Sequence, residues 1–262
     1  GRGPAAVDWR RVRAVALESD DWGLCGFVPA DSALAGFDAA AVAPGRFPEV
    51  YWRSTLEDSA QVARLCDVLA ATRGRDGLPA VLQPNYITAS LTWDTGDTAA
   101  AREPRWLARE LPALPPAYAR PGLWQAVWAG QARGVWHAEL HGRWHYDPQR
   151  RREAVAASEA AREAARRDLL LFPGSARAWE LGAWRDRDTL AGELTRSLGV
   201  FEDLFGRRPR SVIAPDYHWD DRCEELWLAA GLRTIQAHRG QRRDDHLQRE
   251  AGRPLPEHIR RH

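Results

Sequence analysis

The chain of 262 residues contains no methionine and no lysine, so arginine fills all 37 of its Lys-or-Arg positions. Without a methionine at position 1, we expect a processed or partial chain. The uniform use of arginine, together with abundant alanine, is typical of coding bias, and it leads to no functional prediction.

Cysteine is also scarce. Cys25, Cys66 and Cys223 are widely spaced and form no CxxC pair, which argues against a disulfide framework and against a zinc–thiolate site. Scattered cysteines fit a reducing compartment, so we expect a cytoplasmic protein. A leader removed upstream of Gly1 is also compatible with the sequence.

Long apolar runs and an excess of one charge are absent as well. No run approaches the roughly 20 apolar residues of a membrane-spanning helix, so we expect no membrane span. The 37 basic and 36 acidic residues leave a net charge of +1, which argues against a nucleic-acid partner. With 44% hydrophobic and 28% charged residues, the composition is that of a globular protein able to bury a large core.

Short β-like runs alternate with helical patterns along the chain. The expected strands are residues 12–18, 79–83, 135–140, 211–214 and 232–236. One expected helix follows a capping box at Ser54–Glu57. The others span 122–132, 148–170, 189–205 and 220–230, and Asp220 is the expected N-cap of the last. This alternation predicts an α/β fold with a parallel sheet.

We expect one domain over residues 1–262. Residues 92–121 are rich in turn residues and proline and are expected to be an insertion, and residues 240–262 an irregular tail. Five strands are fewer than a closed (β/α) barrel needs, so any such barrel would be open or incomplete at the C-terminus.

Polar residues gather where the predicted strands end. They are Asp20, Asp21, Asn85, His141, His145, 216–218 and His238. Functional groups of parallel α/β folds collect at the carboxyl edge of the sheet, so we expect these side chains to converge.

Two overlapping histidine pairs lie four residues apart. In an extended strand, His137 and His141 would be roughly 13 Å apart, too far to share one ion. His141 and His145 instead flank Gly142, which allows the chain to turn and bring the two rings together. Two imidazoles and a carboxylate from Asp20 or Asp21 would suit Zn²⁺, or alternatively Co, Mn, Ni or Fe.

Three motifs in this order resemble those of the NodB-type polysaccharide deacetylases, and more closely the branch that carries an HGRxH element. They are Asp20-Asp-Trp-Gly23, Glu139-Leu-His-Gly-Arg-Trp-His145 and Ala214-Pro-Asp-Tyr217. The resemblance covers residues 12–239. It implies a distorted (β/α) barrel that hydrolyses N-acetyl groups of amino-sugar glycans with the help of a divalent metal.

The resemblance also implies roles for single residues. Asp20 would be the catalytic base, and Asp21, His141 and His145 would hold the metal. Pro215 and Tyr217 would line the substrate groove, where a main-chain amide helps to stabilise the oxyanion. Trp144 flanks the histidine motif and is expected to bind sugar through its aromatic face.

Some positions depart from the family pattern. Ala214 stands where the family has an arginine that orients the base, and residues 236–239 replace an Asp-rich motif. The Leu-x-His that supplies the general acid is not evident, since His246 and His258 lack a strand context. We therefore expect His238 to act as the acid.

These departures leave two alternatives beside a carbohydrate deacetylase. One is a catalytically impaired barrel that binds glycans. The other is a different metal hydrolase on a similar barrel, such as a phosphoesterase or glycosidase, although these usually need more carboxylates than the motifs provide. In the first two readings the partner is a carbohydrate, and the oligomeric state stays open.

Overall fold

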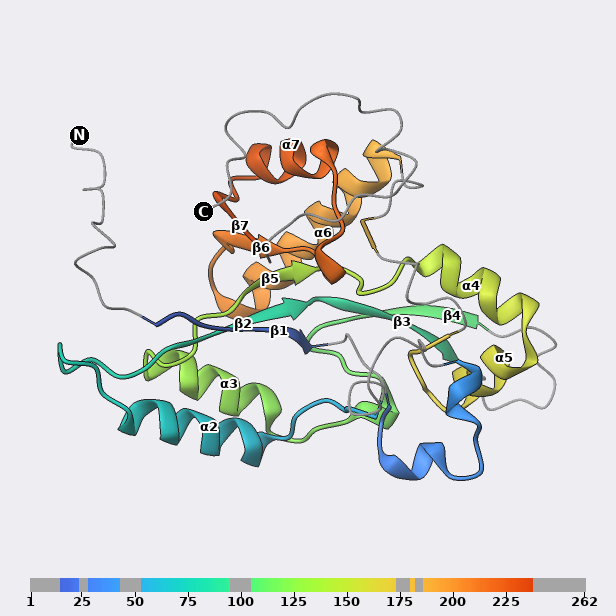
Figure 1. Cartoon of the computed structure of the whole chain (residues 1–262), viewed down its shortest axis with the longest axis horizontal. Helices are drawn as coiled ribbons and strands as arrows, with labels where there is room; N and C mark the ends of the chain where they lie inside the picture. The colour runs from blue at the N-terminus through green and yellow to red at the C-terminus, as the bar shows by residue number, and fades with distance from the viewer. Residues whose placement is uncertain are drawn as a thin grey trace.

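A five-stranded parallel sheet forms the centre of the molecule (Figure 1). The structure is a computed structural model that describes residues 15–23, 28–42, 53–94, 105–172, 180–181 and 186–237. The strand order is β1-β2-β5-β6-β7, and every pairing in this sheet is parallel. The bounds are β1 (Leu17–Gly23), β2 (Leu82–Ile87), β5 (Glu139–Gly142), β6 (Ser211–Ile213) and β7 (Thr234–Gln236).

The sequence predicted all five of these strands, but it placed the first three too early. The hydrophobic runs only lead into them, and the strands continue into the polar motif residues Asp20, Asn85 and His141. Backbone pairing with a neighbouring strand does not require an apolar side chain, so the ladder extends to the residues that carry the site.

Capping residues mark the starts and ends of the helices, and some of them are the residues that the sequence predicted. Helix α2 (Ser59–Ala71) begins at a capping box, but its members are Asp58 and Gln61 rather than Ser54 and Glu57. Helix α6 (Arg187–Phe205) ends at Gly206, whose φ of +69° suits a glycine. Helices α3 (Leu123–Ala132) and α7 (Asp221–Ala229) lie where predicted, and the carboxylate of Asp220 caps α7 as expected.

Two segments differ from their predicted form. Residues 148–170 form two helices, α4 (Pro148–Ala157) and α5 (Glu159–Arg166), because Ser158 ends one and caps the next. The predicted insertion contains strand β4 (Arg105–Glu110), which pairs antiparallel with β3 (Ala89–Asp94). The remaining short helical turns are η1 (Asp31–Leu34), η2 (Ala39–Ala41), η3 (Pro116–Tyr118) and η5 (Pro215–Tyr217).

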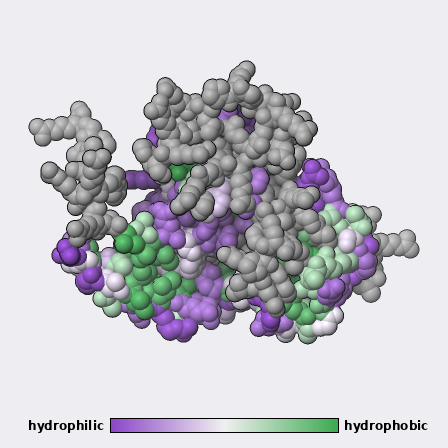
Figure 2. Space-filling view, in the orientation of Figure 1, coloured by the Kyte–Doolittle hydropathy of each residue, from purple (hydrophilic) through white to green (hydrophobic). Residues whose placement is uncertain are grey.

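Helices cover the sheet from two sides. Helices α2 and α3 lie beside β1 and β2, α6 and α7 beside β5 to β7, and α4 and α5 near the β3–β4 pair (Figure 1). The main core contains the buried side chains of Tyr86, Leu123, Leu140 and Phe201. A hydrophobic patch remains visible over α2 and α3 (Figure 2). Among the described residues, no helix combines the length and the apolar character needed to cross a membrane.

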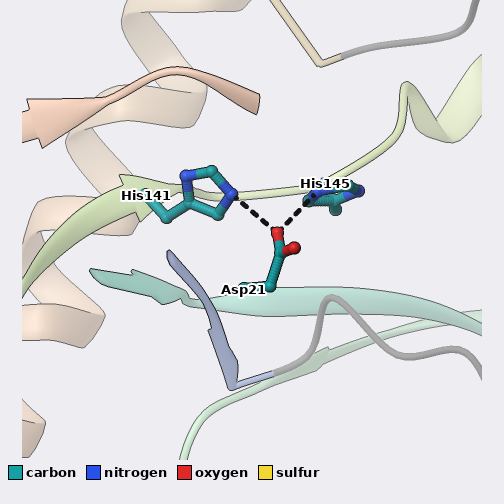
Figure 3. Close-up of side chains that lie close together, drawn as sticks. All are labelled: Asp21, His141 and His145. Atoms are coloured by element: carbon teal, nitrogen blue, oxygen red, sulfur yellow. Dashed lines mark hydrogen bonds and ion pairs between the residues drawn. The ribbon is translucent and has the colours of Figure 1, made fainter. Parts of the chain in front are cut away.

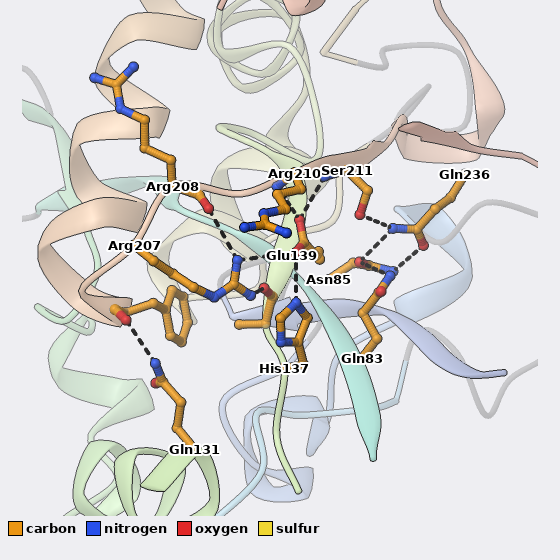
Figure 4. A network of polar contacts seen from close by, with 12 residues as sticks. Gln83, Asn85, Gln131, His137, Glu139, Arg207, Arg208, Arg210, Ser211 and Gln236 are labelled. Atoms are coloured by element: carbon orange, nitrogen blue, oxygen red, sulfur yellow. Dashed lines mark hydrogen bonds and ion pairs between the residues drawn. The ribbon is translucent and has the colours of Figure 1, made fainter. Parts of the chain in front are cut away.

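The sheet curls strongly. The side-chain amide of Asn85 on β2 donates to Oε1 of Gln236 on β7 at 3.0 Å, although β5 and β6 lie between these strands (Figure 4). In a flat sheet the two strands would be roughly 14 Å apart, at about 4.8 Å per strand. Within the described ranges, however, β1 and β7 are edges and no closed barrel forms, so the expected barrel is here an open, curled sheet.

A buried carboxylate joins β5 to β6. Strand β6 pairs with β5 at a single register position, and Glu139 accepts hydrogen bonds at 2.7 Å from the backbone N–H groups of Arg210 and Ser211. Arg207 and His137 also contact this carboxylate, each at 3.2 Å (Figure 4). Glu139 thus substitutes for the missing part of the ladder.

Replacing Glu139 by glutamine should lower the free energy of unfolding by about 2–4 kcal/mol. The amide oxygen could still accept from the two N–H groups, but the amide NH₂ would then face Arg207 and could not neutralise its charge. Urea denaturation measures this change. Glu202→Gln is the control, since Glu202 forms an exposed pair with Arg208 and should cost less than about 1 kcal/mol. Equal effects of the two variants would contradict the structural role of Glu139.

A second carboxylate, Glu57, precedes α2 and has a buried Oε1 without a hydrogen-bond partner among the described residues. Burial raises the pKa of Glu57 to about 7, against the opposing effects of a backbone hydrogen bond and the charge of Arg120. The folded state therefore binds a proton more tightly than the unfolded chain does. This group's contribution to stability must then fall as the pH rises from about 4.5 to 7.

Glu57→Gln should remove this pH dependence. Relative to wild type, the variant should gain up to about 3 kcal/mol of stability at pH 8 and almost none at pH 4, since 1.36 kcal/mol corresponds to each pKa unit. Urea denaturation at both pH values gives the difference. A stability difference that does not change between pH 4 and pH 8 would show that Glu57 titrates normally.

Candidate metal centre

Asp21, His141 and His145 converge at the carboxyl edge of the sheet (Figure 3). Oδ1 of Asp21 lies 3.1 Å from Nε2 of His141 and 3.0 Å from Nε2 of His145. One nitrogen or oxygen atom of each side chain lies within 4.8 Å of those of the other two. The three residues that the sequence predicted as metal ligands are thus brought together from two strands and the turn that follows one of them.

Asp21 reaches this position through an irregular backbone. Its φ is +65°, in the left-handed region, and the pairing of β1 with β2 shifts register between Ser19 and Trp22. Such a bulge re-aims a side chain locally. The neighbouring carboxylate of Asp20 is half-buried, and its charge acts on His141, so both acidic residues influence the same imidazole.

Gly142 makes the turn between the two histidines. Its φ is +149°, and a Cβ atom there would lie 2.4 Å from Oε2 of Glu180. The turn brings the ring centroids of His141 and His145 to 5.5 Å, as the sequence predicted. His137 remains outside this group, with 52% of its side chain exposed and Glu139 as its partner.

The backbone fixes the orientation of His141. Its Nδ1 lies 3.0 Å from the carbonyl oxygen of Ile213, which can only accept, so Nδ1 carries a proton and Nε2 points to Asp21. Burial lowers the pKa of His141, but the hydrogen bond and charge of Asp21 outweigh it and raise this pKa. Desolvation opposes ionisation of Asp21, whereas the charge of His145 and hydrogen bonds from both imidazoles hold its pKa well below its usual range.

The donor set fits a divalent metal ion. Two imidazole nitrogens and one carboxylate oxygen are ligands that zinc and related ions accept, usually with a further position for water or substrate. The hydrogen bond from Nδ1 of His141 to a carbonyl is the outer contact that commonly orients such a ligand. The residues therefore form a possible metal site, and they do not select among divalent ions.

The segment after β6 adopts a strained turn. Asp216 and Tyr217 have φ values of +49° and +59°, and η5 (Pro215–Tyr217) contains both. The N–H groups of Tyr217 and His218 donate to the carbonyls of Ala214 and Pro215, so in this conformation they stabilise the turn. Such strain is common at functional sites. The roles predicted for Pro215 and Tyr217 stay predictions.

Two further predicted site residues are Trp144, which lies in a small buried cluster, and His238, which is not among the described residues. Trp144 is buried, packs with Ala89 and Leu91, and has the guanidinium of Arg143 over its ring at 4.7 Å. These contacts give it a packing role, and sugar binding by Trp144 stays a prediction. His238, the expected acid, lies outside the described residues, as do Cys25, His246 and His258.

Sequence reasoning missed the charged groups that contact the histidine turn, which is the segment 142–145 that leads from His141 to His145. Arg143 is buried and pairs with Glu193 on α6 and with Glu110 on β4. Glu180 accepts from the backbone N–H of Arg143. The available signal was an arginine inside a motif expected at the carboxyl edge of the sheet, because an arginine that is buried there requires acidic partners.

Comparisons with known proteins do not assign this chain to a family. No protein-family model and no curated protein matches the chain. Among solved structures, IcaB from Ammonifex degensii matches with a TM-score of 0.32 and 12% identity over 68% of this chain and 72% of its own. A de-N-acetylase from Aggregatibacter actinomycetemcomitans matches with the same score and identity over 84% and 85%. Likeness this weak establishes neither a shared fold nor a shared activity.

His141→Ala should abolish stoichiometric binding of a divalent metal, because it removes the ligand whose orientation the backbone fixes. Elemental analysis of purified protein, before and after supplementation with zinc, measures this. His137→Ala is the matched control, since that histidine lies four residues away and outside the triad. Wild-type protein without metal above background would contradict the assignment.

Proposed function

We propose that this protein is a metal-dependent hydrolase that removes N-acetyl groups from amino-sugar glycans. The observation that carries the proposal is the convergence of Asp21, His141 and His145 beside a second carboxylate, Asp20. The order of the motifs that supply them resembles the polysaccharide deacetylases. Zn²⁺ is the first candidate for the metal, with Co, Mn, Ni and Fe as alternatives.

Each acidic residue has a separate task in this proposal. Asp21, with His141 and His145, would hold the metal, which would supply Lewis acidity toward the amide carbonyl. Asp20 is outside the triad and would accept the proton of the attacking water as general base. His238 would donate a proton to the departing amine, so that acetate and a free amino sugar are released.

One observation favours a second candidate, a catalytically impaired domain that binds glycans without turnover. Ala214 stands where the resemblance calls for an arginine to orient the base, and its side chain is buried in the core. That position therefore offers Asp20 no charged partner. Under this alternative the triad still binds metal, but the protein binds N-acetylated sugars without hydrolysing them.

Asp20→Asn should lower the rate of acetate release from N-acetylated oligosaccharides by about 10²–10⁴-fold while leaving the metal content unchanged, because only the general base is lost. Acetate and free amines are measured together. The control is Asp67→Asn, which alters an exposed carboxylate paired with Arg133 and should keep full activity.

Other outcomes separate the alternatives. Binding of the oligosaccharide with no acetate release at any pH would favour the glycan-binding candidate. Release of phosphate from phosphate esters, or of reducing ends from glycans, without acetate would identify a different hydrolase. Acetate release that Asp20→Asn does not change would contradict the role of Asp20.

A further inference from the structure

Arg143 occupies an unusual place between the two metal-ligand candidates of the histidine turn. Only 3% of its side chain is exposed, yet it carries a full charge at neutral pH. Its Nε lies 2.5 Å from Oε2 of Glu193, and its Nη2 lies 2.6 Å from Oε1 of Glu110. The guanidinium thus connects the turn to helix α6 and to strand β4 at the same time.

The backbone of Arg143 is held as firmly as its side chain. Its N–H donates to both carboxylate oxygens of Glu180, at 3.2 and 3.0 Å, and its carbonyl accepts from the N–H of Ala89 at 2.8 Å. One residue earlier, the carbonyl of Gly142 accepts from the N–H of Thr88. The peptide that leads to His145 therefore has little freedom to rotate.

Charge explains why the turn needs this residue. The guanidinium side chain faces the carboxylates of Glu110 and Glu193, and the main-chain N–H of the same residue faces Glu180. Removal of the guanidinium would leave both carboxylates without their shared cation. The loss should weigh most on Glu193, whose side chain is 17% exposed, and less on Glu110, which is 44% exposed. A lysine could not replace it fully, because a single ammonium lacks the planar fork that reaches two carboxylates from different elements.

We propose that Arg143 is a positioning residue for the metal centre. Through Glu193 and Glu110 it holds the turn after Gly142, so that His145 faces Asp21 at 3.0 Å. The inference rests on the proposed function only in that the triad binds a metal. The two acidic partners of Arg143 lie 33 residues earlier and 50 residues later in the chain, so three separate parts of the chain must fold together before His145 is in place.

The test compares metal affinity in wild type, Arg143→Gln, Arg143→Lys and His145→Ala. Zinc affinity is measured by competition with a chelator, and the Co²⁺-substituted proteins are compared by their visible absorption spectra. Arg143→Gln should bind zinc about 10–100-fold more weakly, an effect of the size that follows when a group that orients a metal ligand is lost. Its Co²⁺ spectrum should shift toward that of His145→Ala, and Arg143→Lys should lie between wild type and Arg143→Gln.

Arg207→Gln is the matched control. Arg207 also pairs with a buried carboxylate, Glu139, but near the other end of β5 and away from the histidine turn. It should lower stability against urea and leave zinc affinity and the Co²⁺ spectrum unchanged. If Arg143→Gln does not fold, Glu193→Gln replaces it, since it keeps the guanidinium and its contact with Glu110, and the same loss of affinity is expected.

The failures are distinguishable. Wild-type affinity and spectrum in folded Arg143→Gln, or in Glu193→Gln if that variant replaces it, would overturn the positioning role and leave the proposed function intact. An equal loss of affinity in Arg207→Gln would also overturn it, because the effect would then reflect general stability. Wild-type protein that takes up neither Zn²⁺ nor Co²⁺ would overturn the proposed function together with this inference.

Discussion

The reversal of the chain at Gly142 is the constraint on which the candidate centre depends. Residues four apart in a strand are roughly 13 Å apart, so one carboxylate could not contact both His141 and His145 in an extended conformation. With the turn, both Nε2 atoms lie within 3.1 Å of Oδ1 of Asp21. The position requires glycine twice over, through its φ and through the closeness of Glu180.

Strand β5 shows how a short element can be held firmly enough to carry a site. It has four residues and one register position with β6. Carboxylates act near both of its ends, since Glu139 accepts from two N–H groups of the β6 side and Glu180 accepts from the N–H of Arg143. These buried acids supply contacts that a longer ladder would otherwise provide, and each is neutralised or hydrogen-bonded.

The sequence predicts the parts of this structure that depend on local pattern. Hydrophobic runs lead into the first three strands and coincide with most of the last two. The His-Gly-Arg-Trp-His spacing locates the ligand pair, because a glycine between two histidines allows the backbone to turn there. The β3–β4 pair was missed because β4 (Arg105–Glu110) shows no clear alternation and lies in a segment rich in turn residues and proline, although β3 (Ala89–Asp94) does alternate apolar and polar residues. The partners of Arg143 were also missed, because Glu110 and Glu193 are brought to it only by the tertiary fold. The curl of the sheet likewise depends on distant residues such as Asn85 and Gln236.

Hydrogen-bond geometry at His141 shows how far the protein itself orients one ligand of the candidate metal centre. Its Nδ1 faces the carbonyl of Ile213 and its Nε2 faces Asp21, so both nitrogens can donate only when the ring is an imidazolium, which agrees with its raised pKa. The positive charge that this arrangement favours lies against the Asp21 carboxylate. A divalent cation at Nε2 would meet the same carboxylate and would compete with that proton, as metals do at histidine ligands. The carbonyl of Ile213 keeps Nδ1 protonated in either case. The fold therefore fixes the direction of the ligand atom independently of what occupies the space in front of it, and this is the property that a preorganised metal site requires.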